Sequence, residues 1–212
     1  MKKWQKYSGY MENGDWHCHT KYADGRNTVL EMCQQAKRNG LKLIAFTEHV
    51  RMDLSYDFGS LVKDIENARK KYPKMKILAG CETKVLDAEG NLDVSEEVLK
   101  KCDIVLATFH GFPNSDKKEL ESALKNMLKR PEVDIWTHPI TFFQKCPMCK
   151  KDVHKIIRLC VKNKVLIENN IKPRYSSPRL IEICRKMGAK IITGSDAHGT
   201  EDLRVLKEGS QG

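Results

Sequence analysis

Apolar and polar positions along this chain follow two alternating patterns. Short continuous apolar runs, such as Leu43-Ile44-Ala45-Phe46, are typical of strands that are buried on both faces. We expect seven such strands, at residues 14–19, 42–47, 76–82, 103–110, 134–138, 165–169 and 190–196. Between them, apolar residues recur at helical spacing, which predicts helices over residues 28–39, 60–72, 94–101, 115–129, 152–163 and 178–187.

The regular alternation of strands and helices predicts an α/β fold with a parallel sheet. Gly40 and Gly188 each stand between a helical segment and the next strand, a position typical of a helix C-cap, so the connections are short. Seven strand–helix units favour a closed or nearly closed barrel, similar to the eightfold (β/α) barrel with one unit missing. A doubly wound open sheet is the alternative.

Composition is consistent with a single domain over residues 1–212. Apolar residues make up 40% of the chain, enough for a sizeable core. The formal net charge of +10 makes anionic substrates or nucleic acid natural partners. Much of this excess lies on predicted helix surfaces, as at Arg69-Lys70-Lys71, where it indicates only a solvated face.

The cysteines and the absence of long apolar runs indicate the cellular compartment. Eight cysteines are scattered through Lys-rich sequence, which is typical of reduced thiols rather than a disulfide framework. The start of the chain is basic but has no apolar signal core, and no run approaches the length of a membrane span. We therefore expect a cytoplasmic protein with no membrane partner. Cys146 and Cys149 have redox or zinc-knuckle spacing, but no second pair accompanies them, so we favour a plain loop over a labile disulfide or peripheral metal site.

Histidines collect where the predicted strands end. Six of the seven lie at the end of a strand or just beyond it, and Glu82 and Asp196 occupy equivalent places. These histidines are His17, His19, His49, His110, His138 and His198. The carboxyl ends of parallel barrel strands converge on one face, so residues distant in sequence would meet there. The seventh, His154, is inside a predicted helix, and we expect it on the surface.

This set of side chains indicates a metal centre. His17 and His19 are two residues apart on an extended segment, so both side chains point the same way and reach a single cation. So many imidazoles and carboxylates on one rim would be costly unless cations held them. Imidazole combined with carboxylate suits Zn, Mn or Fe better than Mg or Ca.

The same residues carry a resemblance to the PHP family, the polymerase and histidinol phosphatase domain. The ordered motifs are Asp15-Trp16-His17-Cys18-His19-Thr20, Ala23-Asp24-Gly25, Thr47-Glu48-His49, Gly80-Cys81-Glu82, Phe109-His110-Gly111, Thr137-His138-Pro139, Ile167-Glu168-Asn169-Asn170 and Gly194-Ser195-Asp196-Ala197-His198. They cover almost the whole chain. The resemblance implies a distorted (β/α)7 barrel that carries about three divalent metal ions.

The resemblance also implies roles for individual residues. The first metal would be bound by His17, His19, Glu82 and Asp196, and Glu82 would bridge to a second metal held by His110 and His138. A third would lie between Asp24, His49 and His198. Glu168 would orient a metal-binding imidazole rather than bind metal itself. Lys172 and Arg174, in the loop after the sixth strand, are the candidates for binding substrate phosphate.

We therefore expect a metal-dependent phosphoesterase, most simply a phosphatase that attacks a small phosphate monoester with a metal-bound hydroxide. A phosphodiesterase or nuclease is the nearest alternative, because the family also occurs attached to DNA polymerases and the chain is basic. A binding module with a degenerate site and an amidohydrolase-type barrel are the remaining alternatives. The segment after His198, Gly199-Thr200-Glu201-Asp202, lacks the basic residue expected of a histidinol phosphatase.

Overall fold

A computed structural model of the protein describes residues 1–113 and 115–206. The strands are β1 (Gly14–Cys18), β2 (Leu43–His49), β3 (Lys76–Lys84), β4 (Ile104–Thr108), β5 (Ile135–Trp136), β6 (Leu166–Asn170) and β7 (Ile191–Gly194). The α-helices are α1 (Val29–Arg38), α2 (Phe58–Lys71), α3 (Glu96–Lys101), α4 (Lys117–Met127), α5 (Pro139–Lys145), α6 (Lys150–Asn163) and α7 (Pro178–Lys186). Three short 3₁₀ helices, η1 (Lys3–Tyr10), η2 (Pro173–Tyr175) and η3 (Thr200–Asp202), complete the described elements. The seven predicted strands and six predicted helices are all present, and α5 is additional.

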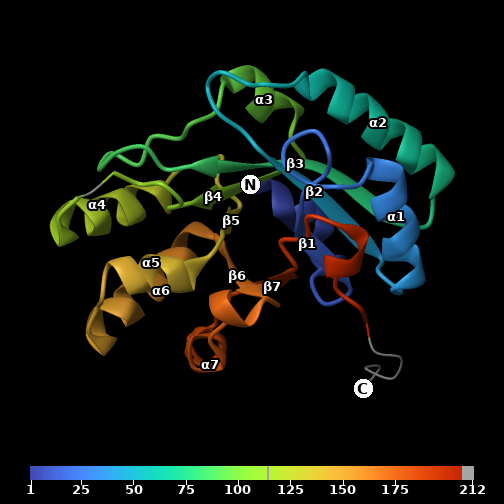
Figure 1. The fold of residues 1–212 in the computed structure, drawn as a ribbon. Coiled ribbons are helices and arrows are strands. Elements are labelled where there is room, and N and C mark those ends of the chain that lie inside the picture. Colours follow the sequence, from blue (N-terminus) through green and yellow to red (C-terminus); the bar gives the residue numbers. More distant parts are fainter. Residues whose placement is uncertain (114, 207–212) are drawn as a thin grey trace.

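The strands form one sheet in the sequential order β1 to β7, and every neighbouring pair is parallel. Viewed along the barrel axis, they form a ring with the helices outside it (Figure 1). The first and last strands meet, because the Asp196 amide donates to the His17 carbonyl and the His19 amide to the Ala197 carbonyl, both at 2.8 Å. The nearly closed barrel is thus confirmed, and the open doubly wound sheet is excluded.

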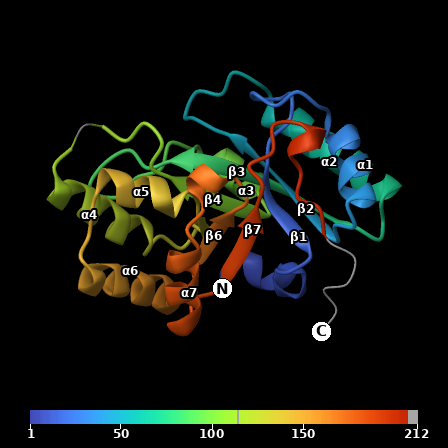
Figure 2. The ribbon, with the colours of Figure 1, turned by 60° about the horizontal axis from the view of Figure 1, so that its bottom comes forward.

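A buried carboxylate reinforces this seam. Asp15 in β1 is completely buried, and its two oxygens accept hydrogen bonds from the backbone amides of Ser195 (2.9 Å) and Arg204 (3.2 Å). Figure 2 shows β7 lying beside β1 at this junction. The seam positions the residues that follow β1 and β7 next to one another, which matters for the site described below.

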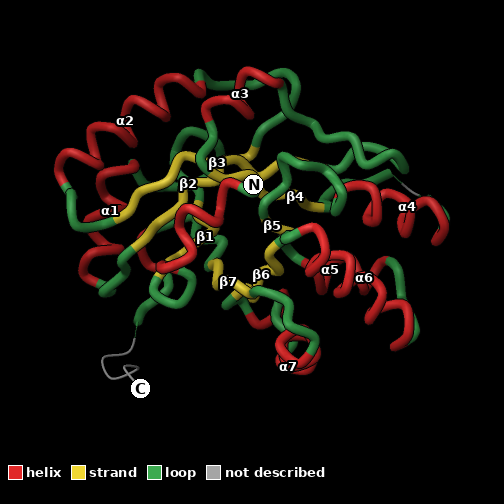
Figure 3. The backbone as a smooth tube through the Cα atoms, turned by 180° about the vertical axis from the view of Figure 1, so that it is seen from behind, coloured by secondary structure: helices red, strands yellow, loops and turns green. Residues whose placement is uncertain are grey.

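The N-terminal helix η1 covers the end of the barrel where the strands begin, a feature that the sequence pattern did not reveal. The Trp4 side chain is buried, its indole donates to the Lys164 carbonyl at 2.7 Å, and its amide donates to Asp134. The ammonium group of Lys2 donates to the carbonyls of Arg130 and Val133, just before β5. Figure 3 shows the N-terminus within the outline of the ring of strands.

Apolar side chains form two cores. The smaller core fills the barrel and comprises Trp4, Trp16, Leu43, Ala45, Leu78, Ile104, Leu106, Ile135, Leu166 and Ile192. The larger core lies between the strands and the surrounding helices. Because side chains alternate along each strand, the same strands supply both cores, which explains their continuous apolar sequence. No helix among the described residues is long and apolar enough to cross a bilayer.

Turn geometry decides where several elements end. Gly40 and Gly188 have φ of 79° and 77°, as expected for C-caps in the left-handed region. The fifth strand is shorter than predicted because His138 has φ of 49°, and Pro139 then starts α5. Proline is favoured in the first helical turn, where no amide donor is needed. The segment predicted as strand end therefore turns directly into a helix.

Candidate metal centre

The nine predicted metal-binding side chains lie together on one face of the barrel, at or just beyond the strand ends. Potential ligand atoms form four groups, within each of which all atoms lie within 4.8 Å of one another. The groups are His17, His19 and Glu82; Glu82, His110 and His138; His19, Asp24, His49 and His198; and His17, His138 and Glu168. Asp196 is in none of these groups, but its Oδ1 lies 3.3 Å from Nε2 of His19, so these segments all meet on one rim.

Glu82 lies at the middle of the cluster. Its Oε1 is 3.6 Å from Nε2 of His17 and 3.4 Å from Nε2 of His138, and its Oε2 is 3.0 Å from Nδ1 of His49. Nε2 of His17 is in turn 3.1 Å from Nε2 of His19, so the two side chains do point the same way. One carboxylate thus lies between two groups of histidines and could bridge cations bound by them.

Two further groups flank this carboxylate. On one side the rings of His110 and His138 stack with centroids 4.5 Å apart. On the other, one oxygen of Asp24 is 3.4 Å from Nε2 of His49 and 3.3 Å from Nε2 of His198. The His19 ring lies between these two histidines, so it is shared between two groups instead of belonging only to the first.

Asp196 and His138 both have left-handed backbones, with φ of 51° and 49°. Such conformations cost about 1–3 kcal/mol for residues other than glycine and are found most often at functional sites. The turn at Asp196 brings its Oδ1 to 3.3 Å from Nε2 of His19 and 3.8 Å from Nε2 of His17. Both turns aim a side chain from a strand end into the cluster.

Several buried polar atoms in the cluster make no hydrogen bond of good geometry to any described residue, although the Glu82 oxygens lie 3.0–3.6 Å from histidine nitrogens. They are both oxygens of Glu82, both ring nitrogens of His138 and Nδ1 of His19. Each such atom costs about 1–3 kcal/mol if nothing compensates it. Bound cations would compensate them, and the mixture of nitrogen and carboxylate donors fits zinc, manganese or iron.

The pKa shifts differ between the histidines: burial would lower the pKa of His17, but Glu168 and Glu82 raise it well above its usual value, whereas two other histidines are held neutral. Burial, reinforced by the charge of a neighbouring histidine, lowers the pKa of His19 and of His110 to about 4. Neutral imidazole is the form of histidine that coordinates metals. Burial would raise the pKa of Glu82, but the surrounding histidines hold it well below the usual range, so its carboxylate is ionised.

Glu168 holds the ring of His17 in place. Its Oε1 accepts a hydrogen bond from Nδ1 of His17 at 2.7 Å, while its Oε2 accepts from the Thr137 hydroxyl and the His138 amide. Burial would raise the pKa of this carboxyl, but His17 and His138 lower it to about 2. The arrangement leaves Nε2 of His17 directed at Glu82.

The two predicted phosphate-binding residues line a pocket of about 380 Å³ at the cluster. The Lys172 ammonium donates to the backbone carbonyl of Asp196 at 2.5 Å and lies 3.1 Å from its Oδ2. The Arg174 guanidinium stacks on the Tyr175 ring at 4.6 Å, and that ring packs edge-on against His138. Both basic side chains are therefore beside the predicted metal-binding residues.

Sequence reasoning missed Arg26 and Tyr175, which line the same pocket. The Arg26 amide donates to the His198 carbonyl at 2.7 Å, and its guanidinium pairs with Glu201 and Asp202. A basic residue thus does lie next to the segment after His198, although it comes from the loop after β1. The only sequence signal was its place directly after Ala23-Asp24-Gly25.

The sequence of the chain matches a known protein family. Residues 15–172 match the model of the PHP domain. The chain belongs to the PHP domain family. A probable phosphatase from Acetivibrio thermocellus is 33% identical over 203 residues, which cover 87% of this chain and 78% of that protein. This PHP-domain chain is accordingly a phosphoesterase, as its motifs predicted.

Solved structures of two histidinol phosphatases share the fold. A putative histidinol phosphatase from Listeria monocytogenes has a TM-score of 0.68 at 16% identity, with 92% of this chain and 98% of that chain covered. Histidinol phosphate phosphatase from Lactococcus lactis, solved with zinc, L-histidinol and phosphate, has a TM-score of 0.68 at 19% identity, with 89% and 87% covered. These likenesses confirm the distorted seven-stranded barrel.

The remaining candidates lie away from the centre. Cys146 follows α5 and Cys149 precedes α6, so their segment is the expected loop, and both thiols are free. Cys149 is exposed and donates to Asp152 at 3.0 Å. His154 is half-buried on the outer helix α6 rather than fully on the surface, because it borders a pocket between α6 and α7.

Proposed function

We propose that this PHP-domain protein is a phosphatase that hydrolyses a small phosphate monoester at a centre of about three divalent metal ions. The observation that carries the proposal is the cluster around Glu82, whose buried oxygens and neighbouring ring nitrogens have no hydrogen-bond partners among the described residues. Stability alone does not account for such a set, because each of these atoms is costly to bury.

The proposed ligands follow three of the groups in the cluster, with Asp196 added to the first. His17, His19, Glu82 and Asp196 would hold one cation, and Glu82, His110 and His138 a second. Asp24, His49 and His198, with the nearby ring of His19, would hold a third. Cations bound there would lower the pKa of a coordinated water and neutralise charge on the phosphoryl oxygens.

The protein's own groups would orient the centre and bind the phosphate. Glu168 keeps a proton on Nδ1 of His17, and the cations of Lys172, Arg174 and Arg26 line the pocket. A serine nucleophile is not supported, since Ser195 is completely buried and its hydroxyl bonds to the backbone of His17 and Ala197. Zinc and phosphate in the Lactococcus lactis relative support the choice of metal and of a phosphate ester.

Metal removal and return test the proposal. We would strip the purified protein with a chelator and assay a monoester (p-nitrophenyl phosphate), a diester (bis-p-nitrophenyl phosphate) and short oligonucleotides with Zn, Mn or Fe. We expect activity to disappear on stripping, to return with metal, and to favour the monoester by at least about tenfold. Undiminished hydrolysis by the stripped protein would overturn the metal mechanism.

The substrate panel also decides between the proposal and its nearest alternative. Faster cleavage of oligonucleotides than of the monoester would identify a nuclease, an outcome compatible with the net charge of +10. A Glu82→Gln variant is the matched control, because it keeps the shape of the site and removes the central charge. Activity left in that variant at the wild-type rate would belong to a contaminant.

A further inference from the structure

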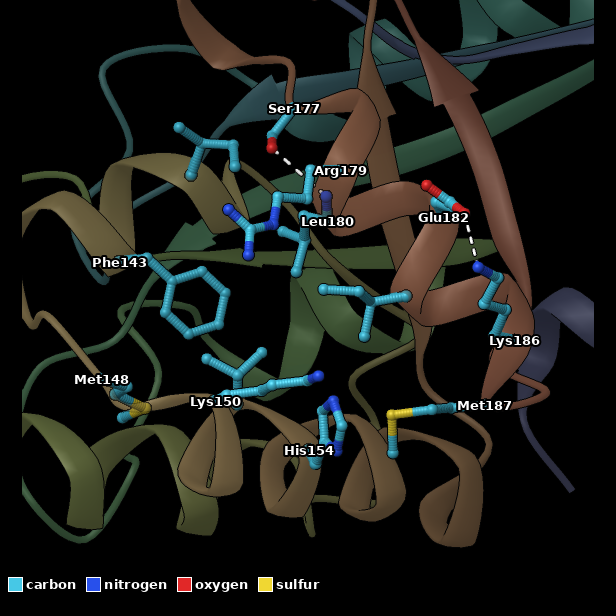
Figure 4. A pocket seen from close by; sticks show the side chains of 13 residues that line it. Phe143, Met148, Lys150, His154, Ser177, Arg179, Leu180, Glu182, Lys186 and Met187 are labelled. Atoms are coloured by element: carbon cyan, nitrogen blue, oxygen red, sulfur yellow. Dashed lines mark hydrogen bonds and ion pairs between the residues drawn. The ribbon is translucent and has the colours of Figure 1, made fainter.

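A second pocket lies outside the barrel, between α5, α6 and α7. Its volume is about 600 Å³, and it shares no lining residue with the pocket at the metal centre. This volume is within the range of sites that hold small molecules, about 300–1,000 Å³. Figure 4 shows the side chains of the three helices facing one another across it.

The walls of this pocket are mostly apolar. The apolar side chains are Ile140, Phe143, Met148, Val153, Leu180, Ile183 and Met187. Apart from the buried Leu180, each of them is half-buried, so a ligand in the pocket would remove further apolar surface from water. Methionine at two places makes the walls adaptable to the shape of the ligand.

The polar side chains around these walls are predominantly basic. Glu182, the one acidic residue that lines the pocket, already pairs with Lys186 at 2.6 Å. Lys150 and Arg179 make no ion pair with any residue in the described ranges 1–113 and 115–206. Figure 4 shows the Arg179 guanidinium near the Phe143 ring and the Lys150 side chain extending toward His154.

Lys150 and Arg179 both lie where a positive charge is unfavourable for a helix. Lys150 begins α6, whose first turn also contains the acidic Asp152, and Arg179 is in the first turn of α7, a turn with no acidic residue. Cations are unfavourable at helix N-termini, where the helix dipole favours negative charge. A bound anion would reverse that cost, since both cations would then have a partner.

We propose that this pocket binds a small amphiphilic anion, a ligand with an apolar chain or ring and one acidic headgroup. The apolar body would lie against Phe143, Met148 and Met187, and the headgroup between Lys150 and Arg179. The charge of the rim and the apolar walls together select this ligand class over a neutral apolar molecule or a cation. The inference does not depend on the proposed phosphatase activity.

Methionine methyl signals test this binding directly. We would label the methionine methyl groups with ¹³C, assign Met148 and Met187 from leucine variants, and titrate with octanoate, octanesulfonate and octanol. We expect saturable shifts of both signals with an anion, while those of Met32 and Met127, buried elsewhere, stay fixed. Whichever of octanoate and octanesulfonate binds more tightly would identify the preferred headgroup as carboxylate or sulfonate-like. Octanol, which has no charge, is expected to bind at least tenfold more weakly than either anion.

Charge reversal supplies the matched control. The double variant K150E/R179E is expected to weaken binding of the anion at least tenfold. The control R158E/R185E makes the same charge change at exposed positions on the same two helices but outside the pocket, and should bind within twofold of wild type. Equal binding of octanol and octanoate, equal losses in the two double variants, or no shift of Met148 and Met187 would each overturn the proposal.

Discussion

Nδ1 of His17 lies 2.7 Å from Oε1 of Glu168, and both side chains are completely buried. The two residues come from β1 and β6, the strands on either side of β7. The bond fixes which ring nitrogen of His17 carries the proton and leaves Nε2 directed at Glu82. Carboxylates that orient a metal-binding histidine in this way commonly contribute tenfold to hundredfold in metal affinity.

Replacing this carboxylate should therefore weaken metal binding without unfolding the protein. We expect Glu168→Gln to lower the affinity for zinc by about tenfold to hundredfold, with activity recovering at high metal concentration. Titration of the stripped protein with zinc measures the affinity. Glu97→Gln, at an exposed position on α3, is the control. Unchanged affinity in the Glu168 variant would contradict the orienting role.

The sequence predicted the strands and the rim of histidines because both depend on local patterns. Continuous apolar runs such as 43–46 identify barrel strands, and polar residues stand out where those runs end. Arg26 and Tyr175 could not be placed in the same way. Their position at the centre depends on how two loops fold back over the barrel, which hydrophobic periodicity does not encode.

The N-terminal and fifth-strand segments were harder to predict for different reasons. Helix η1 has little apolar periodicity, since only Trp4 among its residues is fully buried. Its position depends on bonds from Lys2, Lys3 and Trp4 to distant carbonyls. At β5 the left-handed backbone of His138 ends the strand early, and only a tertiary bond from its amide to Glu168 accounts for that turn.

The cations in the pocket should act on substrate binding. We expect Arg174→Ala to raise KM for the monoester about tenfold with a smaller effect on kcat, since a charge-assisted hydrogen bond contributes about 1.5–3 kcal/mol. Lys172→Ala should lower kcat as well, because Lys172 also contacts Asp196. Steady-state kinetics separate the two effects. Arg185→Ala, on the exposed side of α7, is expected to match wild type, and a normal KM for the Arg174 variant would rule out its phosphate contact.

Helix η1 should contribute to the stability of the whole barrel. Trp4→Ala removes a buried indole and its bond to Lys164, so we expect the free energy of unfolding to fall by about 3 kcal/mol or more. Urea denaturation measures this change. Lys6→Ala, at an exposed position in the same helix, should change stability by less than about 0.5 kcal/mol. Equal stability of the two variants would mean that η1 is peripheral to folding.

Glu48 should make stability depend on pH in a direction opposite to that of an ordinary ion-paired carboxylate. Its Oε1 accepts hydrogen bonds from the amide and hydroxyl of Thr20, but its buried Oε2 has no hydrogen-bond partner among the described residues. Burial raises the pKa of Glu48 to about 8, above its ordinary value of 4.5, despite the bonds from Thr20. The folded protein therefore holds a proton that the unfolded chain releases over this range.

The free energy of unfolding should consequently fall as pH rises from 4.5 to 8, by up to about 1.4 kcal/mol per pH unit from this group. Glu48→Gln resembles the protonated form and removes this dependence, so the variant should gain stability relative to wild type as pH increases through the window. Urea denaturation at several pH values, with a chelator present throughout, measures the difference in the free energy of unfolding between the variant and wild type. Contributions from the other titrating groups are common to both proteins and cancel in this difference. Glu89→Gln, at an exposed position, should show a constant difference from wild type. A constant difference for the Glu48 variant would instead mean that Glu48 is ionised in the folded protein, with a partner for its second oxygen.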